Sequence, residues 1–151
     1  MRFLSFLLLS FLMSTTSHAI VTGEMIMVRS TEAFPETMAL LQEAISKQGY
    51  TLSRVQRVDV GLNAKGYKTD KYRVVFFGKG DQIQQISARY PELIPYLPLK
   101  IAIYAEGDDT ILISANPGVF SDMFQIEALR PTFEQWLKDI NIILNAVQIQ
   151  N

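Results

Sequence analysis

The chain has 151 residues, of which 48% are hydrophobic and 19% are charged, and its formal net charge is −1. That length fits one domain, and so large an apolar share excludes a disordered chain. Cysteine is absent and histidine occurs once, so a disulfide framework and thiolate chemistry are excluded as well.

The first residues are typical of a secretory signal peptide. Arg2 supplies a positive charge, residues 3–13 are apolar except for two serines, and Ser17-His18-Ala19 places small residues at the cleavage positions. The apolar stretch is too short for a transmembrane helix, which needs about 20 residues. We therefore predict a signal peptide over residues 1–19, cleavage after Ala19, and a periplasmic or secreted protein without an integral membrane segment.

Removal of residues 1–19 leaves one expected domain over residues 20–151, with a net charge of −2 and with neither histidine nor cysteine. Triads based on His or Cys, zinc sites with nitrogen and sulfur ligands, and haem with a His ligand all lose a necessary residue. Carboxylate or lysine chemistry, binding of hard cations through oxygen, and binding without chemistry stay open. We expect no cofactor and no metal.

The first part of the remaining chain predicts a strand, a helix and a hairpin. Residues 25–29 predict a short strand, and apolar residues three and four apart over residues 34–45 predict a helix. Ser30 or Thr31 is expected to cap this helix, with Pro35 in its first turn and Gly49 after its last turn. Two runs rich in β-branched and aromatic residues, 50–60 and 67–77, predict a hairpin around a glycine-containing loop.

A short helix and a proline-rich segment come next. Asp81 is expected to cap the helix, which Pro91 ends. The segment 91–99 holds three prolines among large apolar residues, and it predicts an irregular loop. A loop cannot satisfy its own backbone, so this one is expected to cover the core or to line a pocket or an interface.

The last part predicts a second hairpin and a long helix. Residues 100–106 and 110–115 form the hairpin, and Pro131 opens a helix whose apolar stripe extends from Phe133 to Val147. Because hairpins dominate the strand pairing, we predict an α+β fold, a two-layer sandwich with a largely antiparallel sheet and helices packed on one face.

The pattern resembles the domain-of-unknown-function family 302 over about residues 25–117. The resemblance lies in Gly49-Tyr50 after the first helix, Val58-Asp59-Val60-Gly61-Leu62 before Gly66, the strand 72–77, Tyr90-Pro91-Glu92-Leu93, Leu97-Pro98-Leu99 and the strand 101–104. It implies a fold of the TATA-binding-protein type and a homodimer, and it leaves the activity open. Many relatives carry a cysteine where this chain has Leu99, so no thiol or metal role is carried over.

The charges are concentrated in the first predicted hairpin. Two acids, Asp59 and Asp70, oppose seven basic residues there, which are Arg54, Arg57, Lys65, Lys68, Lys71, Arg73 and Lys79. Such a hairpin either attracts an anionic ligand, an acidic partner or a lipid headgroup surface, or it is a solvated edge protected by lysines. Strand alternation places Lys71 and Arg73 on one face and Tyr72 on the other.

We take six residues as candidate ligand-binding residues: Arg54, Arg57, Lys71, Tyr72, Arg73 and Tyr96. Export and the negative net charge argue against nucleic acid as a partner. The acidic cluster Glu106, Asp108 and Asp109 is either a solvated turn or part of a carboxylate pair.

These observations favour a non-catalytic binding or accessory module that forms a homodimer and recognises a small anionic or apolar ligand. The alternative is a carboxylate- or lysine-dependent enzyme that acts on a small anionic substrate at the basic hairpin 54–79, and we predict no catalytic residue for the binding module. A third interpretation is a carrier of apolar ligands between the proline-rich segment and the last helix.

Overall fold

The structure, a computed structural model, describes residues 20–148 and contains a six-stranded sheet in the order β1-β2-β6-β5-β4-β3. Every neighbouring pair is antiparallel. The strands are β1 (Ile20–Thr22), β2 (Met25–Ser30), β3 (Thr51–Arg57), β4 (Tyr72–Gly78), β5 (Leu99–Glu106) and β6 (Asp109–Ala115). The predicted signal peptide and its cleavage site lie outside the described residues.

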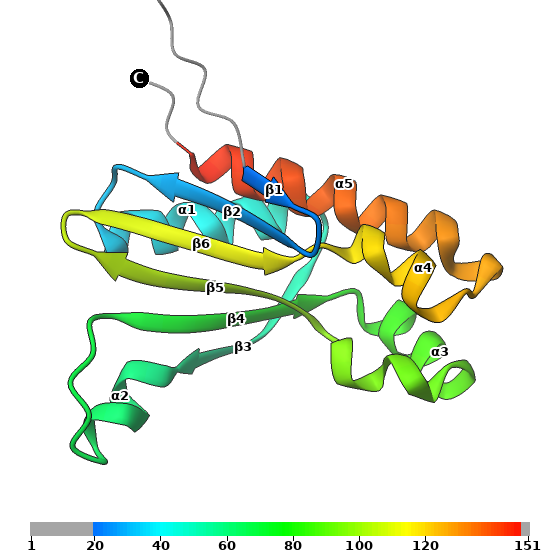
Figure 1. The fold of residues 1–151 in the computed structure, drawn as a ribbon, viewed down its shortest axis with the longest axis horizontal. Helices are drawn as coiled ribbons and strands as arrows, with labels where there is room; N and C mark the ends of the chain where they lie inside the picture. Colours follow the sequence, from blue (N-terminus) through cyan, green and yellow to red (C-terminus); the bar gives the residue numbers. More distant parts are fainter. Residues whose placement is uncertain (1–19, 149–151) are drawn as a thin grey trace, which may run out of the picture.

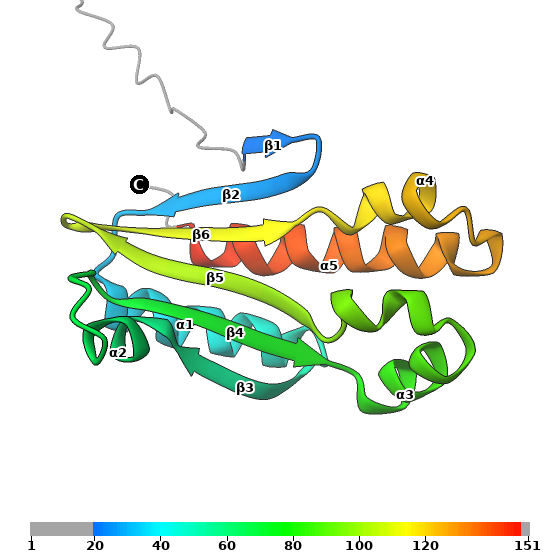
Figure 2. The same cartoon turned by 60° about the horizontal axis from the view of Figure 1, so that its bottom comes forward.

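Two long helices cover one face of this sheet, as Figures 1 and 2 show for α1 and α5. The helices are α1 (Phe34–Lys47), α2 (Val58–Asn63), α3 (Gly80–Arg89), α4 (Phe120–Phe124) and α5 (Arg130–Val147), with short 3₁₀ turns at Pro91–Tyr96, Pro117–Val119 and Glu127–Leu129. The predicted α+β fold, with a largely antiparallel sheet and helices on one face, is confirmed.

The core lies between the sheet and these two helices. In α5 the predicted stripe is buried, with Phe133, Ile140 and Ile143 at 1% exposure or less. Residues of β2, β6, β5 and β4 that point the same way meet this stripe and α1; they include Ile26, Val28, Leu112, Ile101, Ile103 and Val75. Burial of each such side chain contributes about 1.5–3 kcal/mol, so this layer supplies most of the driving force for folding.

The predicted cap of α1 is wrong. Ala33 occupies the N-cap position and provides no side-chain hydrogen bond. The Ser30 hydroxyl instead accepts a hydrogen bond from the Glu32 N–H at 3.3 Å and lies 3.3 Å from Thr37 Oγ1, because β2 continues through Ser30 and fixes its side chain on the core side. Pro35 in the first turn and the left-handed Gly49, with φ of +75°, are confirmed.

Three further elements differ from the sequence prediction. The first hairpin strand ends at Arg57, and α2 occupies positions 58–63, where strand and loop were predicted. The short helix begins at Gly80, so Asp81 lies in its first turn and is not its cap. The segment predicted as an irregular loop forms a 3₁₀ helix over Pro91–Tyr96, because the prolines fix φ near the value that this helix needs.

Within residues 20–148 no helix is both long enough and apolar enough to cross a membrane.

Candidate functional site

One face of the sheet carries no helix, and we call it the bare face. Strand register places Met27, Ile113, Ala102 and Val74 side by side across β2, β6, β5 and β4. Their chain neighbours point into the core, so these side chains point away from α1 and α5. All four are partly exposed, which makes an apolar row across the middle of the bare face.

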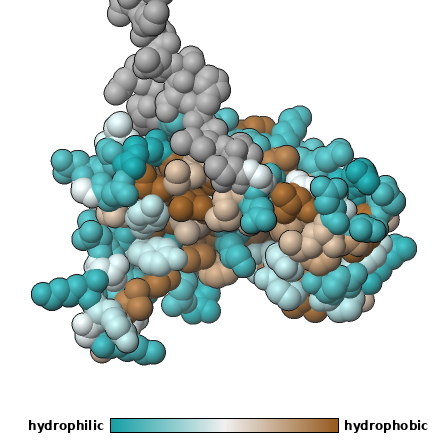
Figure 3. Space-filling view, viewed as in Figure 1, coloured by the Kyte–Doolittle hydropathy of each residue, from teal (hydrophilic) through white to brown (hydrophobic). Residues whose placement is uncertain are grey.

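Figure 3 looks onto this face and shows a brown band of hydrophobic side chains across the sheet. Met25 at one end is 42% exposed, and Phe76 and Tyr104 on neighbouring strands are half-buried. Contiguous apolar surface of this kind is uncommon on a monomeric protein, which makes this face a candidate interaction surface.

A pocket of about 380 Å³ opens on the bare face where the loop 64–71 reaches β4. Tyr72 and Tyr104 are direct partners on β4 and β5 and form its walls. Ala102 and Ile113 form its floor, and Thr69, Asp70 and Lys71 form its rim. Ala102 has the smallest side chain of the apolar row, and the sheet surface is hollow at that point for this reason. We call this hollow the bare-face pocket.

A second pocket, of about 340 Å³, lies at the same end of the sheet but on the side of the helices, and we call it the helix-side pocket. Its lining combines the start of α1, the β5–β6 turn and the loop before β4; it comprises Ala33, Phe34, Pro35, Asp70, Lys71, Ala105, Gly107, Asp108 and Asp109. The Lys71 ammonium and the Arg73 guanidinium lie 5.9 Å and 5.6 Å from the centre of the Phe34 ring. Asp70 and Lys71 border both pockets, so this dipeptide separates them.

Arg73 is held by an ion pair with Asp59 of α2. Both side chains are largely buried, at 14% and 11% exposure. The hydrogen bond from Arg73 holds the pKa of the Asp59 carboxyl below its ordinary value, although burial acts in the opposite direction. Arg73 therefore serves to fasten α2 to β4, and its charge is already matched.

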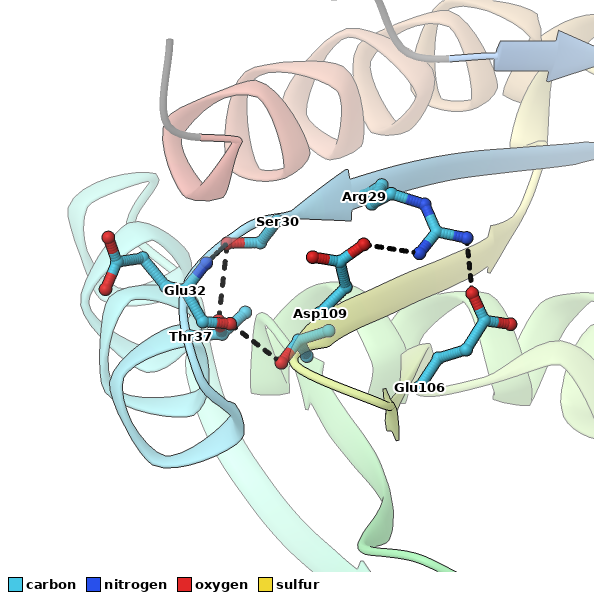
Figure 4. A network of polar contacts seen from close by, with 7 residues as sticks. Arg29, Ser30, Glu32, Thr37, Glu106 and Asp109 are labelled. Atoms are coloured by element: carbon cyan, nitrogen blue, oxygen red, sulfur yellow. Dashed lines mark hydrogen bonds and ion pairs between the residues drawn. The ribbon is translucent and has the colours of Figure 1, made fainter. Parts of the chain in front are cut away.

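A polar network fixes the β5–β6 turn and the start of α1, which border the helix-side pocket (Figure 4). Arg29 of β2 donates to Asp109 at 2.7 Å and also pairs with Glu106. These two hydrogen bonds raise the pKa of the Arg29 guanidinium. Beneath them, the hydroxyls of Thr37 and Thr110 both donate to the Glu32 carbonyl at 3.0 Å. Two of the three acids of the predicted acidic cluster are thus engaged in structural ion pairs.

The structure brings together only part of the predicted ligand-binding set. Lys71 and Tyr72 border the bare-face pocket. Arg57 and Arg73 are register partners, and Arg73 is occupied by Asp59.

The other two members of the set lie elsewhere. Arg54 is the register partner of Phe76, four residues along β4 from Tyr72, or about 13 Å. Tyr96 lies in the 3₁₀ helix Pro91–Tyr96, where its ring packs edge-on against Phe120 and Phe124 with centroids 5.2 Å and 5.3 Å apart. Tyr96 therefore packs against the core and does not share a site with Lys71.

Sequence reasoning missed Tyr104, Ala102, Ile113 and Asp70 as members of the site. The two hairpins were predicted as separate units. The pairing of β4 with β5, which joins them across α3, was not predicted. Alternation along residues 100–106 was the available signal, because it sets Ala102 and Tyr104 on the face opposite to the buried Ile101 and Ile103.

A carrier of apolar ligands and a metal site find little support in the described part of the chain. The hollow between Tyr96, Phe120 and Ile140 measures about 30 Å³, which is room for one water and not for an apolar cargo. Among residues 20–148 no three acidic or histidine side chains converge as metal ligands.

Comparisons with known proteins agree on a single family. The family model "Domain of unknown function DUF302" matches residues 26–147. The crystal structure of an uncharacterized conserved DUF302 protein from Bacillus stearothermophilus superposes with a TM-score of 0.75 at 17% sequence identity, covering 84% of this chain and 100% of the other. No curated protein matches the chain.

Proposed function

The chain belongs to the DUF302 family, whose name specifies no activity, and from the site itself we propose an exported, non-catalytic binding module that forms a homodimer through the bare face. The observation that supports this proposal is the apolar row Met27–Ile113–Ala102–Val74. No helix within residues 20–148 covers this row. The other face of the sheet packs against α1 and α5 in the core.

A second copy is the partner that this surface suits best. The row is apolar, and its side chains are partly exposed on regular strands. Two such faces can therefore pack against each other as the two sheets of a sandwich do, about 10 Å apart. A contact between identical surfaces related by a two-fold axis needs no charge complementarity, and Val74, Ala102 and Ile113 carry no charge.

Native mass spectrometry of the protein purified from its own cell envelope tests the proposal. We expect a chain that begins at Ile20 and a mass of two chains. Val74→Glu places a charge at the β4 end of the apolar row and should give a folded monomer, whereas Gln84→Glu on the exposed side of α3 should leave the dimer intact. A wild-type monomer at about 10 μM, or a dimer that survives Val74→Glu, contradicts the proposal.

The helix-side pocket favours a second candidate, a lysine- or carboxylate-dependent enzyme for a small anionic substrate. Lys71 lies there with Asp70 and Asp108, which are the groups that such chemistry needs. Incubation with a panel of small carboxylate and phosphate esters tests it. Turnover that Lys71→Gln abolishes and Lys68→Gln preserves would establish the enzyme; the binding module predicts no turnover.

A further inference from the structure

We propose that the tip of the first hairpin docks on a bilayer that contains anionic phospholipids. Residues 54–73 comprise the end of β3, α2, the loop 64–71 and the start of β4, and we call this segment the basic arm. In Figure 1, α2 and the loop project at the lower left, away from the rest of the sheet. The tip, residues 60–68, contributes neither to the apolar row nor to the lining of either pocket, so this docking does not require the homodimer.

Charge distinguishes the basic arm from the rest of the chain. The arm contains six basic residues and two acids, a net charge of +4. Residues 20–53 and 74–151 contain seven basic residues and thirteen acids, a net charge of −6. An anionic surface attracts the arm and repels the remainder, so a protein with this charge separation approaches such a surface with the arm first.

The cations at the tip have no acidic partner in the described part of the chain. Lys65 and Lys68 are exposed, and neither forms an ion pair with a residue of 20–148. Asp59 is engaged by Arg73, and Asp70 lies at the pocket end of the loop. The tip therefore presents two ammonium groups to the phosphates of a headgroup layer.

Exposed apolar groups accompany these lysines. Tyr67, between Lys65 and Lys68, is 64% exposed, the highest value of any large hydrophobic side chain that the structure describes, and Val60 is 46% exposed. Figure 3 shows hydrophobic side chains between hydrophilic ones on the part that projects at the lower left. Tyrosine is enriched at membrane interfaces, where its ring meets the apolar boundary and its hydroxyl stays among the headgroups. Lysine stems lie along apolar surface while their ammonium groups stay in water.

Backbone hydrogen bonds hold the tip in one conformation. The amides of Lys65 and Tyr67 both donate to the Leu62 carbonyl, at 3.0 Å and 3.1 Å. Gly66 between them has a φ of +87°, which glycine adopts without strain. The tip is therefore preformed, and binding does not have to order a flexible loop.

A bilayer fits this tip better than an acidic protein does. A stable protein interface buries about 800 Å² on each partner and needs complementary shapes. One projecting turn is too small and too convex to supply such an area. Lipid headgroups rearrange around a convex insertion, and a depth of about 5–10 Å brings apolar side chains to the edge of the acyl chains.

Co-sedimentation of the purified protein with large vesicles tests the inference. We compare vesicles of phosphatidylcholine alone with vesicles of phosphatidylglycerol and phosphatidylcholine in equal amounts. We expect the protein to sediment with the anionic vesicles only. Salt at about 1 M, which shortens the screening length to about 3 Å, should release it.

Charge variants then assign the binding to the tip. Each lysine near an anionic surface contributes about fivefold to binding, so Lys65→Gln with Lys68→Gln should weaken binding to anionic vesicles by about 25-fold. Lys47→Gln with Lys138→Gln is the matched control, because it removes two exposed charges from α1 and α5 and should leave the binding within about twofold of the wild type. All four positions are exposed, so both double variants should stay folded.

Variants of Tyr67 report the apolar contribution and the position of the tip. Tyr67→Ser keeps the net charge and should weaken binding to anionic vesicles. Tyr67→Trp should show a blue shift of its emission when these vesicles are added, since the indole enters a less polar environment. Trp136 is 2% exposed within the core, so the shift arises from the tip.

Absence of sedimentation with anionic vesicles overturns the inference, and so does equal binding by the two double lysine variants. Wild-type binding by Tyr67→Ser, or unchanged emission from Tyr67→Trp, would indicate a general attraction of anions, such as an acidic protein, and would overturn docking on a bilayer. None of these substitutions lies in the apolar row, so the mass of the same samples tests the homodimer separately.

Discussion

Tyr50, just before β3, donates a hydrogen bond of 2.7 Å to Asp139 in the middle of α5, and both residues are 5% exposed. Gln135 donates to the other carboxylate oxygen of Asp139 at 2.8 Å. Burial, together with the hydrogen bond to Asp139, raises the pKa of Tyr50, so its phenol stays a donor at any physiological pH. This contact links α5 to the end of α1 and accounts for a carboxylate in the core.

Tyr50→Phe should therefore destabilise the protein by about 1–3 kcal/mol, because a buried carboxylate oxygen loses its donor while the packing is kept. Urea unfolding followed by the fluorescence of Trp136, the single tryptophan and 2% exposed, gives the free energy of unfolding. Tyr67→Phe is the matched control, since Tyr67 is 64% exposed and its loss of a hydroxyl should cost nothing measurable. Equal stability of the two variants would show that the Asp139 contact contributes little.

The ion pair of Asp59 with Arg73 gives the stability a defined dependence on pH. Arg73 holds the pKa of Asp59 below its ordinary value, so the folded protein binds this proton more weakly than the unfolded chain does. The contribution is fully present above the unfolded pKa of about 3.9 and is lost as the pH falls through the lower folded pKa. We expect the free energy of unfolding to fall below about pH 4 for this reason.

Asp59→Asn should reduce stability at neutral pH by about 2 kcal/mol and flatten this part of the pH profile. Asp108→Asn, an exposed acid with no ion pair among the described residues, should leave both quantities unchanged. Urea titrations at pH 3, 4, 5 and 7 distinguish the two variants. A profile for Asp59→Asn that parallels the wild type between pH 3 and 5 would rule out this pair as the source of the effect.

Periodicity predicted the long elements because their burial is one-sided. The stripe of α5 and the alternation of β5 each place several large apolar residues on one face, and tertiary packing reinforces that pattern. The helix α2 was not predicted, because Val58 and Val60 are β-branched and favour a strand. The ion pair of Asp59 with Arg73 stabilises the helix at this position. A contact between positions that are 14 apart is invisible to a local pattern.

The candidate site was only half predictable for a related reason. Lys71 and Tyr72 stand in a charged, aromatic run that composition singles out. Ala102 contributes by the smallness of its side chain, which has meaning only beside Tyr104 and Ile113 in the assembled sheet. Tyr96 was misplaced because an aromatic residue in a proline-rich segment suggests a pocket, whereas its ring closes the core against Phe120 and Phe124.

Gly78, the last residue of β4, packs directly against Ile83 of α3. A Cβ at this buried position would lie 2.2 Å from Ile83 Cδ1 and 3.2 Å from Ile83 Cγ1. Gly78→Ala should thus cost about 1–3 kcal/mol through overpacking, with Ile83 forced to another rotamer. Gly80→Ala is the control, because nothing lies within 4 Å of that Cβ and alanine favours the helix that begins there, so stability should be unchanged or rise by up to about 1 kcal/mol. Thermal unfolding should give a lower midpoint temperature for Gly78→Ala than for Gly80→Ala. Equal midpoint temperatures would mean that the Ile83 side chain moves aside without cost and that its contact with Gly78 does not position α3.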